Sequence, residues 1–236
     1  MKRSLSLTLL VVAGLMLFSI ASCGGSNDRK ITEIPKEETK QYAQADYTYD
    51  YEDDMYSKND ITSSSFKPFP VYTDGRSPDN HYVASGYMGD YSDVSIDISS
   101  FDKPYSGSTC IKIVYKNTVS NGARWVGVYW QSPANNWGDR QGGFDLTGAK
   151  KVTFWAKGAK GGERIEEFKI GGITGLYPDS DIAGIGPVLL TGEWKKYEID
   201  LRGKDLSYIS GGFCWGTNLD VNPDGATFYL DEIRYE

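Results

Sequence analysis

The segment 151–158, Lys-Val-Thr-Phe-Trp-Ala-Lys-Gly, decides the class of fold. Hydrophobic and polar residues alternate along it with a period of two, so Val152, Phe154 and Ala156 share one face of a strand. The segments 193–201 and 226–235 alternate in the same way, and glycine-rich turns separate such segments. This pattern predicts β-sheets in which one face of each strand is buried.

Nine segments after residue 68 have this character, and no run of ten or more residues has a convincing helical period. The predicted strands are Pro70–Thr73, Asp93–Ile98, Thr109–Lys116, Ala123–Gln131, Lys151–Lys157, Glu166–Gly171, Glu193–Leu201, Gly211–Thr217 and Ala226–Tyr235. So many short strands in one domain predict an all-β fold, a two-sheet jelly-roll sandwich.

The composition excludes several classes of function. The chain has 236 residues, of which 39% are hydrophobic, enough for one sizeable domain with additional segments. Its net charge of −7 argues against a nucleic-acid partner, because a binding groove must neutralise phosphates. The single histidine, His81, argues against a His-rich zinc site and leaves any Ser-His-Asp triad dependent on one residue.

The N-terminus has the features of an export signal. Lys2 and Arg3 precede an apolar stretch at 7–18, which is shorter than the roughly 20 residues that span a bilayer. The following Ile-Ala-Ser-Cys at 20–23 resembles the lipobox of bacterial lipoproteins, although that family prefers Leu at the position of Ile20. An ordinary secretory signal that contains a cysteine is the alternative.

The lipobox resemblance implies a signal peptide at 1–22 and lipidation of Cys23. The protein would then be anchored in the cell envelope through its lipid. No Asp follows Cys23, which in Gram-negative bacteria resembles cargo sent to the outer membrane.

The segment 23–66 is predicted to be a flexible, acidic and tyrosine-rich linker behind the lipidated cysteine. It has few aliphatic residues and many charges, so it buries too little apolar surface to offset its chain entropy. A short binding motif among its tyrosines and aspartates is the alternative. The globular domain is then expected at 67–236.

Several aromatic residues fall on strand faces that otherwise carry polar groups. Flat aromatic rings beside amides and charges suit sugars, since the C–H face of a sugar stacks on an indole while its hydroxyls take hydrogen bonds. Core packing beneath loops is the alternative, and Trp130, Trp194 and Trp215 are expected to be structural. The candidate sugar-binding residues are Trp125, Tyr129, Gln131, Trp137 (as a rim aromatic), Trp155 and Lys157.

The order of the segments 106–113, 143–158, 192–201 and 226–233 resembles a known family. It is similar to the jelly-roll carbohydrate-binding modules of galactose-binding-like fold, such as the family 11 modules of bacterial glucanases. The resemblance implies polysaccharide binding on a concave sheet and a structural calcium ion near the first and last strands. Asp74 and Asp231 match the expected calcium ligands, with turn capping as the alternative role.

Two further patterns are weaker. Residues 220–225, Asp-Val-Asn-Pro-Asp-Gly, match the start of an EF-hand loop but lack flanking helices, which favours a β-turn. Cys110 and Cys214 are either a disulfide or, as we expect, buried free thiols, because pairs within strands often have poor disulfide geometry.

These observations predict a non-catalytic, polysaccharide-binding lipoprotein of the cell envelope. An envelope scaffold or protein-interaction lipoprotein without sugar binding is the alternative. A glycoside hydrolase or lyase is the third hypothesis, since such enzymes need two carboxylates around the scissile bond. Its candidate acids, none in a specific motif, are Glu163, Glu166, Glu167, Asp179 and Asp181.

Overall fold

The computed structural model describes residues 65–236. The predicted signal peptide, the lipidation at Cys23 and nearly all of the predicted linker lie outside the described residues. Within residues 65–236, no helix is long and apolar enough to cross a membrane.

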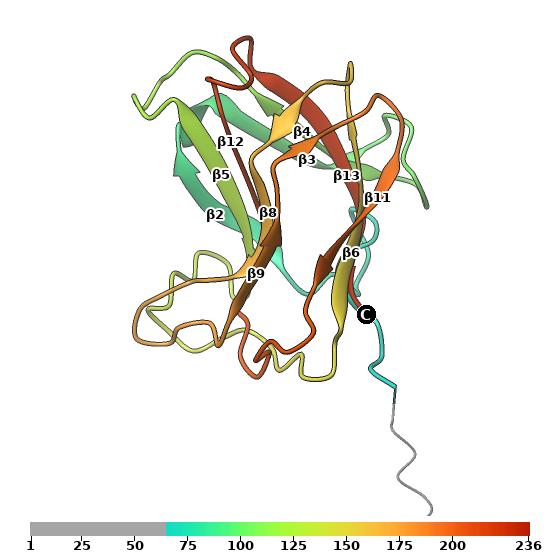
Figure 1. The fold of residues 1–236 in the computed structure, drawn as a ribbon, viewed down its shortest axis with the longest axis vertical. Helices are drawn as coiled ribbons and strands as arrows, with labels where there is room; N and C mark the ends of the chain where they lie inside the picture. The colour runs from blue at the N-terminus through green and yellow to red at the C-terminus, as the bar shows by residue number, and fades with distance from the viewer. Residues whose placement is uncertain (1–64) are drawn as a thin grey trace, which may run out of the picture. The chain divides into compact units, whose positions relative to one another are not determined.

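The domain is built from two antiparallel sheets (Figure 1). Sheet A has the order β11 (Lys195–Asp200), β6 (Lys151–Gly158), β13 (Ala226–Tyr235), β4 (Cys110–Tyr115) and β3 (Val94–Ser100), with β1 (Phe69–Tyr72) paired to the end of β13. Sheet B has the order β2 (Val83–Gly89), β5 (Trp125–Gln131), β12 (Gly211–Asn218), β8 (Glu167–Gly171) and β9 (Ile182–Ile185). A two-stranded ribbon of β7 (Arg164–Ile165) and β10 (Val188–Leu189) and a single 3₁₀ turn, η1 (Tyr91–Asp93), complete the elements.

The chain passes repeatedly between the two sheets, and its last strand holds sheet A together. β13 pairs with β6 along one edge, and with β4 and then β1 along the other. The first and last strands of the domain are therefore neighbours. This two-sheet arrangement confirms the predicted all-β jelly-roll sandwich.

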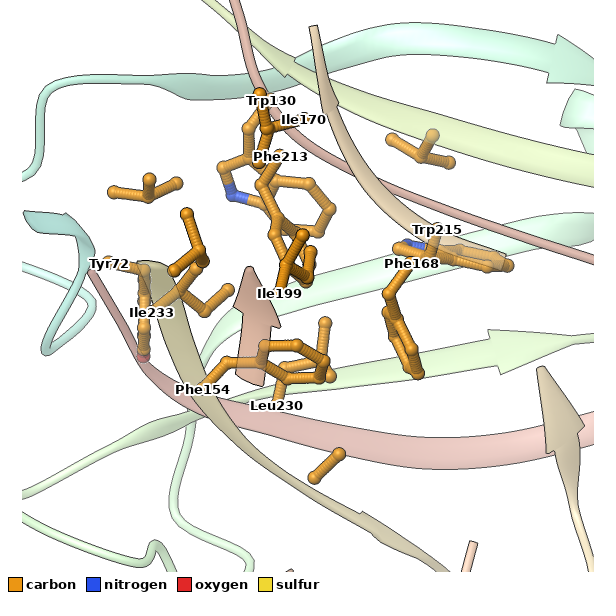
Figure 2. Close-up of a cluster of buried hydrophobic side chains, with 14 of the residues drawn as sticks. Tyr72, Trp130, Phe154, Phe168, Ile170, Ile199, Phe213, Trp215, Leu230 and Ile233 are labelled. Carbon is orange, nitrogen blue, oxygen red and sulfur yellow. The ribbon is translucent and has the colours of Figure 1, made fainter. Parts of the chain in front are cut away.

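Aromatic side chains from the inner faces fill the space between the sheets (Figure 2). Phe213 of sheet B lies at the centre, with its ring centroid 5.1 Å from Phe154 of sheet A and 5.8 Å from Trp130. Trp215 is also fully buried and packs edge-on against Phe228. The expectation that Trp130 and Trp215 are structural is confirmed.

All nine predicted segments contain a strand, and the structure adds β2, β7, β9 and β10. β2 was missed because Gly86 and Gly89 interrupt its alternation, while β7 and β10 have only two residues each. The segment 220–225 forms a turn in which the Gly225 N–H donates to the Asn222 carbonyl, as the β-turn interpretation predicts. Cys110 and Cys214 are both buried and free, as expected.

The central aromatic cluster gives a stability prediction. Phe213→Ala is expected to lower the free energy of unfolding by about 3–5 kcal/mol, because it removes a buried ring and leaves a cavity. The matched control is Phe101→Ala, whose side chain is 80% exposed and which should change stability by less than about 0.5 kcal/mol. Urea denaturation of both variants measures the difference, and similar losses would contradict this packing.

Candidate functional site: a groove on sheet B

The outer face of sheet B has a floor formed by two glycines, of which Gly216 is open, whereas the Met88 side chain lies close over Gly127. Gly127 of β5 is directly opposite Gly216 of β12, and Met88 and Glu167 lie at the two ends of this row. The neighbours of both glycines along their strands are buried between the sheets, so the glycines fall on the outward face by simple alternation. Glycine in a strand interior often marks a place where another molecule approaches the backbone closely.

Aromatic side chains stand beside this floor. Trp125, at the start of β5, is 44% exposed and lies opposite Asn218. On the other side, Tyr129 packs with Cys214, and its ring is almost fully covered. Trp125 and Cys214, together with Met88, Glu166 and their neighbours, line a groove of about 320 Å³, and Tyr129 lies beside it against Cys214.

Charged groups border the same groove. The Lys169 ammonium lies 2.9 Å from the Glu167 carboxylate and 5.6 Å from the centre of the Tyr129 ring. Burial raises the pKa of the Tyr129 hydroxyl well above its usual range, so it stays protonated and donates a hydrogen bond to the Gly171 carbonyl. The groove thus offers an aromatic platform together with both hydrogen-bond donors and acceptors.

The loop 132–142 forms a rim beyond Tyr129. Its Asn136 is fully buried, and the side-chain oxygen of Asn136 accepts a hydrogen bond from the Gly138 N–H. Gly138 in turn accepts a hydrogen bond from the Tyr177 N–H, which fixes this loop against the loop 172–181. Trp137 at the tip is 42% exposed and meets the Tyr129 ring edge-on at 6.0 Å.

The structure divides the six sequence-predicted sugar-binding residues between two faces. Trp125, Tyr129, Gln131 and Trp137 belong to sheet B and its rim, whereas Trp155 and Lys157 lie on the outer face of sheet A. The six candidates therefore do not share one surface, and their sugar binding stays a prediction. Alternation within a strand reveals which residues share a face but not which sheet the strand joins.

Two of the six residues are already occupied by the protein itself. Gln131 is completely buried, donating to the Asn136 carbonyl and accepting from the Ser85 hydroxyl, so it holds the rim loop instead of facing solvent. On sheet A, the Tyr105 ring stacks on Trp155 with centroids 3.6 Å apart and planes at 15°. A sugar could stack on that side of Trp155 only by displacing Tyr105.

Met88, Gly127, Gly216 and Lys169 are groove residues that the sequence analysis did not select. The signal for the glycines was present, because Gly127 interrupts a run of large residues and Gly216 directly follows Trp215. Met88 and Lys169 carried no such signal. Met88 belongs to β2, the strand that the sequence analysis missed. Lys169 is a charged residue of the kind that solvated strand faces ordinarily carry.

The two predicted calcium ligands form turn caps. Asp74 accepts hydrogen bonds from the Gly75 and Ser108 N–H groups and from the Thr109 hydroxyl. Asp231 is buried and accepts from the N–H groups of Tyr105, Ser106 and Glu232, while burial raises the pKa of its carboxyl to about 6.

Every oxygen of these two carboxylates therefore accepts at least one protein donor, and N–H groups repel a cation. Nor do three His, Cys, Asp or Glu side chains within residues 65–236 gather as metal ligands. This arrangement favours the turn-capping alternative. Calcium at Asp74 and Asp231 stays a prediction, and a rise in the thermal midpoint on adding calcium, absent in Asp74→Ala, would support it.

Most of the candidate acids also have structural partners. Asp179 accepts hydrogen bonds from Ile173 and Ser210, which joins the loop 172–181 to β12. Glu166 and Glu167 form ion pairs with Arg164 and Lys169 respectively, and Asp181 pairs with Lys204. These contacts give the carboxylates positions in the fold without requiring a catalytic role.

Comparisons with known proteins give matches in structure alone. No protein-family model matches the chain, and no curated protein matches it. A family 30 carbohydrate-binding module is 16% identical, with a TM-score of 0.49 over 72% of this chain and 98% of its own. The family 11 module of a Clostridium thermocellum cellulosomal cellulase is 17% identical, with a TM-score of 0.41 over 65% and 84%. At these values neither match indicates what the present chain binds.

The anchoring of the rim loop is directly testable. Gln131→Leu removes both hydrogen bonds of the buried amide and leaves the Asn136 carbonyl without its partner, which should cost about 1–3 kcal/mol and loosen the loop 132–142. We expect faster proteolytic cleavage within that loop and a change in Trp137 fluorescence. Gln141→Leu, an exposed glutamine in the same loop, is the matched control; equal behaviour of the two variants would contradict this anchoring role.

Proposed function

We propose that the groove on sheet B binds a glycan without catalysing its cleavage. The observation that carries the proposal is the open backbone at Gly216, in the groove beside the exposed Trp125. A sugar ring can approach this backbone closely and place its C–H face against the indole. Its hydroxyls would find a carboxylate at Glu167 and an ammonium at Lys169.

A second hollow adjoins the groove. It has a volume of about 350 Å³, is lined by Gly184 and Gly186, and shares Glu166 and Glu167 with the groove. The two hollows are therefore neighbours on sheet B. A ligand that fills both would be a stretch of polysaccharide and not a single monosaccharide.

A scaffold role without sugar binding remains the second candidate. The observation in its favour is the Tyr105 ring on Trp155, which shows that one of the predicted platforms is covered by the protein's own loop. It predicts that no glycan binds to the folded domain. A glycoside hydrolase or lyase would instead release products from a bound polysaccharide.

We also propose that the domain is displayed from the envelope membrane through a lipid on Cys23. The motif at 20–23 supports this, and the acidic segment that follows would act as a spacer. Cys23→Ser expressed in a bacterial host is expected to move the protein from the membrane fraction to the soluble fraction and to abolish acyl-chain labelling. Continued membrane association of this variant would contradict the proposal.

Trp125→Ala tests the aromatic platform. Against soluble mixed-linkage β-glucan, xyloglucan, galactomannan and xylan, we expect affinity electrophoresis and tryptophan fluorescence to show binding to at least one polysaccharide. The variant should bind it at least about tenfold more weakly, a loss of about 1.4 kcal/mol. Phe101→Ala removes an exposed aromatic side chain from outside the groove and should bind normally.

Gly216→Ala tests the floor itself. A methyl group at residue 216 would lie 3.7 Å from the Val126 carbonyl oxygen, an ordinary contact, so the fold should tolerate it. The methyl would nevertheless stand where the sugar ring rests, and we expect a loss of glycan affinity with an unchanged melting temperature. Gly192→Ala is the matched control, because residue 192 has similar space but lies outside the groove. Full binding by Gly216→Ala would contradict a ligand on the glycine floor.

A further inference from the structure

A second cavity lies on sheet A, the sheet that does not carry the proposed groove. It encloses about 450 Å³ between the loop 101–105 and the adjoining ends of β6, β11 and β13. It is lined by the rings of Trp194 and Tyr229 and by the charged residues Asp102, Lys103, Lys157 and Glu193. Nothing in the proposed binding to sheet B uses these residues.

Lys157 is held in a fixed position within this cavity. Its ammonium nitrogen lies 4.7 Å from the centre of the Trp194 ring and 4.8 Å from that of Tyr229. It also donates to the backbone carbonyls of Asp102, at 3.4 Å, and Lys103, at 3.2 Å. These partners are all neutral groups, and they set the position of the positive charge without cancelling it.

The nearest acidic group is already paired with another lysine. The Asp102 carboxylate lies 2.6 Å from the Lys112 ammonium, and the Tyr229 hydroxyl also donates to it. Among the described residues, no carboxylate lies within 4.0 Å of the Lys157 nitrogen. An ammonium has three N–H donors, so one remains for a ligand.

The loop that closes the cavity is anchored at several points. The Trp194 indole N–H donates to the Lys103 carbonyl at 3.0 Å. Tyr105 stacks on Trp155, and the buried Asp231 accepts the N–H groups of Tyr105 and Ser106. The cavity is therefore preformed, which lowers the entropy cost of binding a ligand there.

We propose that this cavity is a second ligand site, specific for a sugar that carries a carboxylate, such as a uronic acid. The carboxylate would bind the free N–H of Lys157, with Lys103 nearby, while hydroxyls donate to Asp102 and Glu193 and the ring contacts Trp194 or Tyr229. Asp102 and Glu193 would repel a densely sulfated chain, whereas one carboxylate per sugar can be accommodated beside them.

The test uses oligogalacturonate as the probe and the same oligomer with its carboxylates reduced to alcohols as the uncharged control. Titration calorimetry should show that the charged oligomer binds and that binding weakens with salt, while the reduced oligomer does not bind. Lys157→Met should weaken binding at least about tenfold, and Lys157→Arg should retain most of it. Lys195→Met is the matched control, since the Lys195 ammonium also lies over a tyrosine ring, 5.4 Å from Tyr197, but outside the cavity.

Three results would overturn the proposal: absence of binding, equal binding of the reduced oligomer, or unchanged binding by Lys157→Met. If Lys157→Met does not fold, Lys103→Glu at an exposed position serves in its place and should also weaken binding.

Trp125→Ala should leave this binding intact. Loss of binding in that variant would assign the acidic sugar to the groove on sheet B. Failure of the cavity proposal and failure of the groove proposal are therefore distinguishable.

Discussion

The antiparallel register between β5 and β12 is the constraint on which both the core and the groove depend. It places Trp130 opposite Phe213 on the inner face and Gly127 opposite Gly216 on the outer face. A shift of one residue in either strand would exchange these faces and expose the aromatic rings to solvent. The burial of large rings between the sheets therefore fixes the position of the glycine floor outside them.

Buried polar side chains then hold the loops around this framework. Gln131 anchors the rim loop, Asp179 joins the loop 172–181 to β12, and Asp90 accepts three N–H groups from the turn that precedes β5. A buried carboxylate or amide is tolerated because backbone donors satisfy it. The surroundings of the groove are consequently built from satisfied networks, which suits a preformed site.

Much of the fold could be predicted from the sequence, but the composition of the site could not. The period of two located nine strands and the inward-facing sets such as Val152, Phe154 and Ala156, because alternation is a local property. The assignment of each strand to a sheet depends on long-range pairing, which local pattern does not carry. For that reason the sequence could not show that Trp155 and Trp125, both sugar-binding candidates, belong to opposite sheets. The role of Gln131 likewise depends on a loop conformation that no spacing rule reveals.

The two outer faces differ in chemistry as well as in position. The face of sheet B presents backbone and an exposed indole beside a paired glutamate and lysine, whereas sheet A presents an ammonium without a carboxylate partner between two rings. The central claim, binding on the glycine floor, is tested most directly by NMR chemical-shift mapping with an oligosaccharide of each panel polysaccharide. The account predicts that one of them shifts the amide signals of Gly127 and Gly216 and the indole N–H signal of Trp125. Shifts confined to other surfaces, or none with any oligosaccharide, would contradict it.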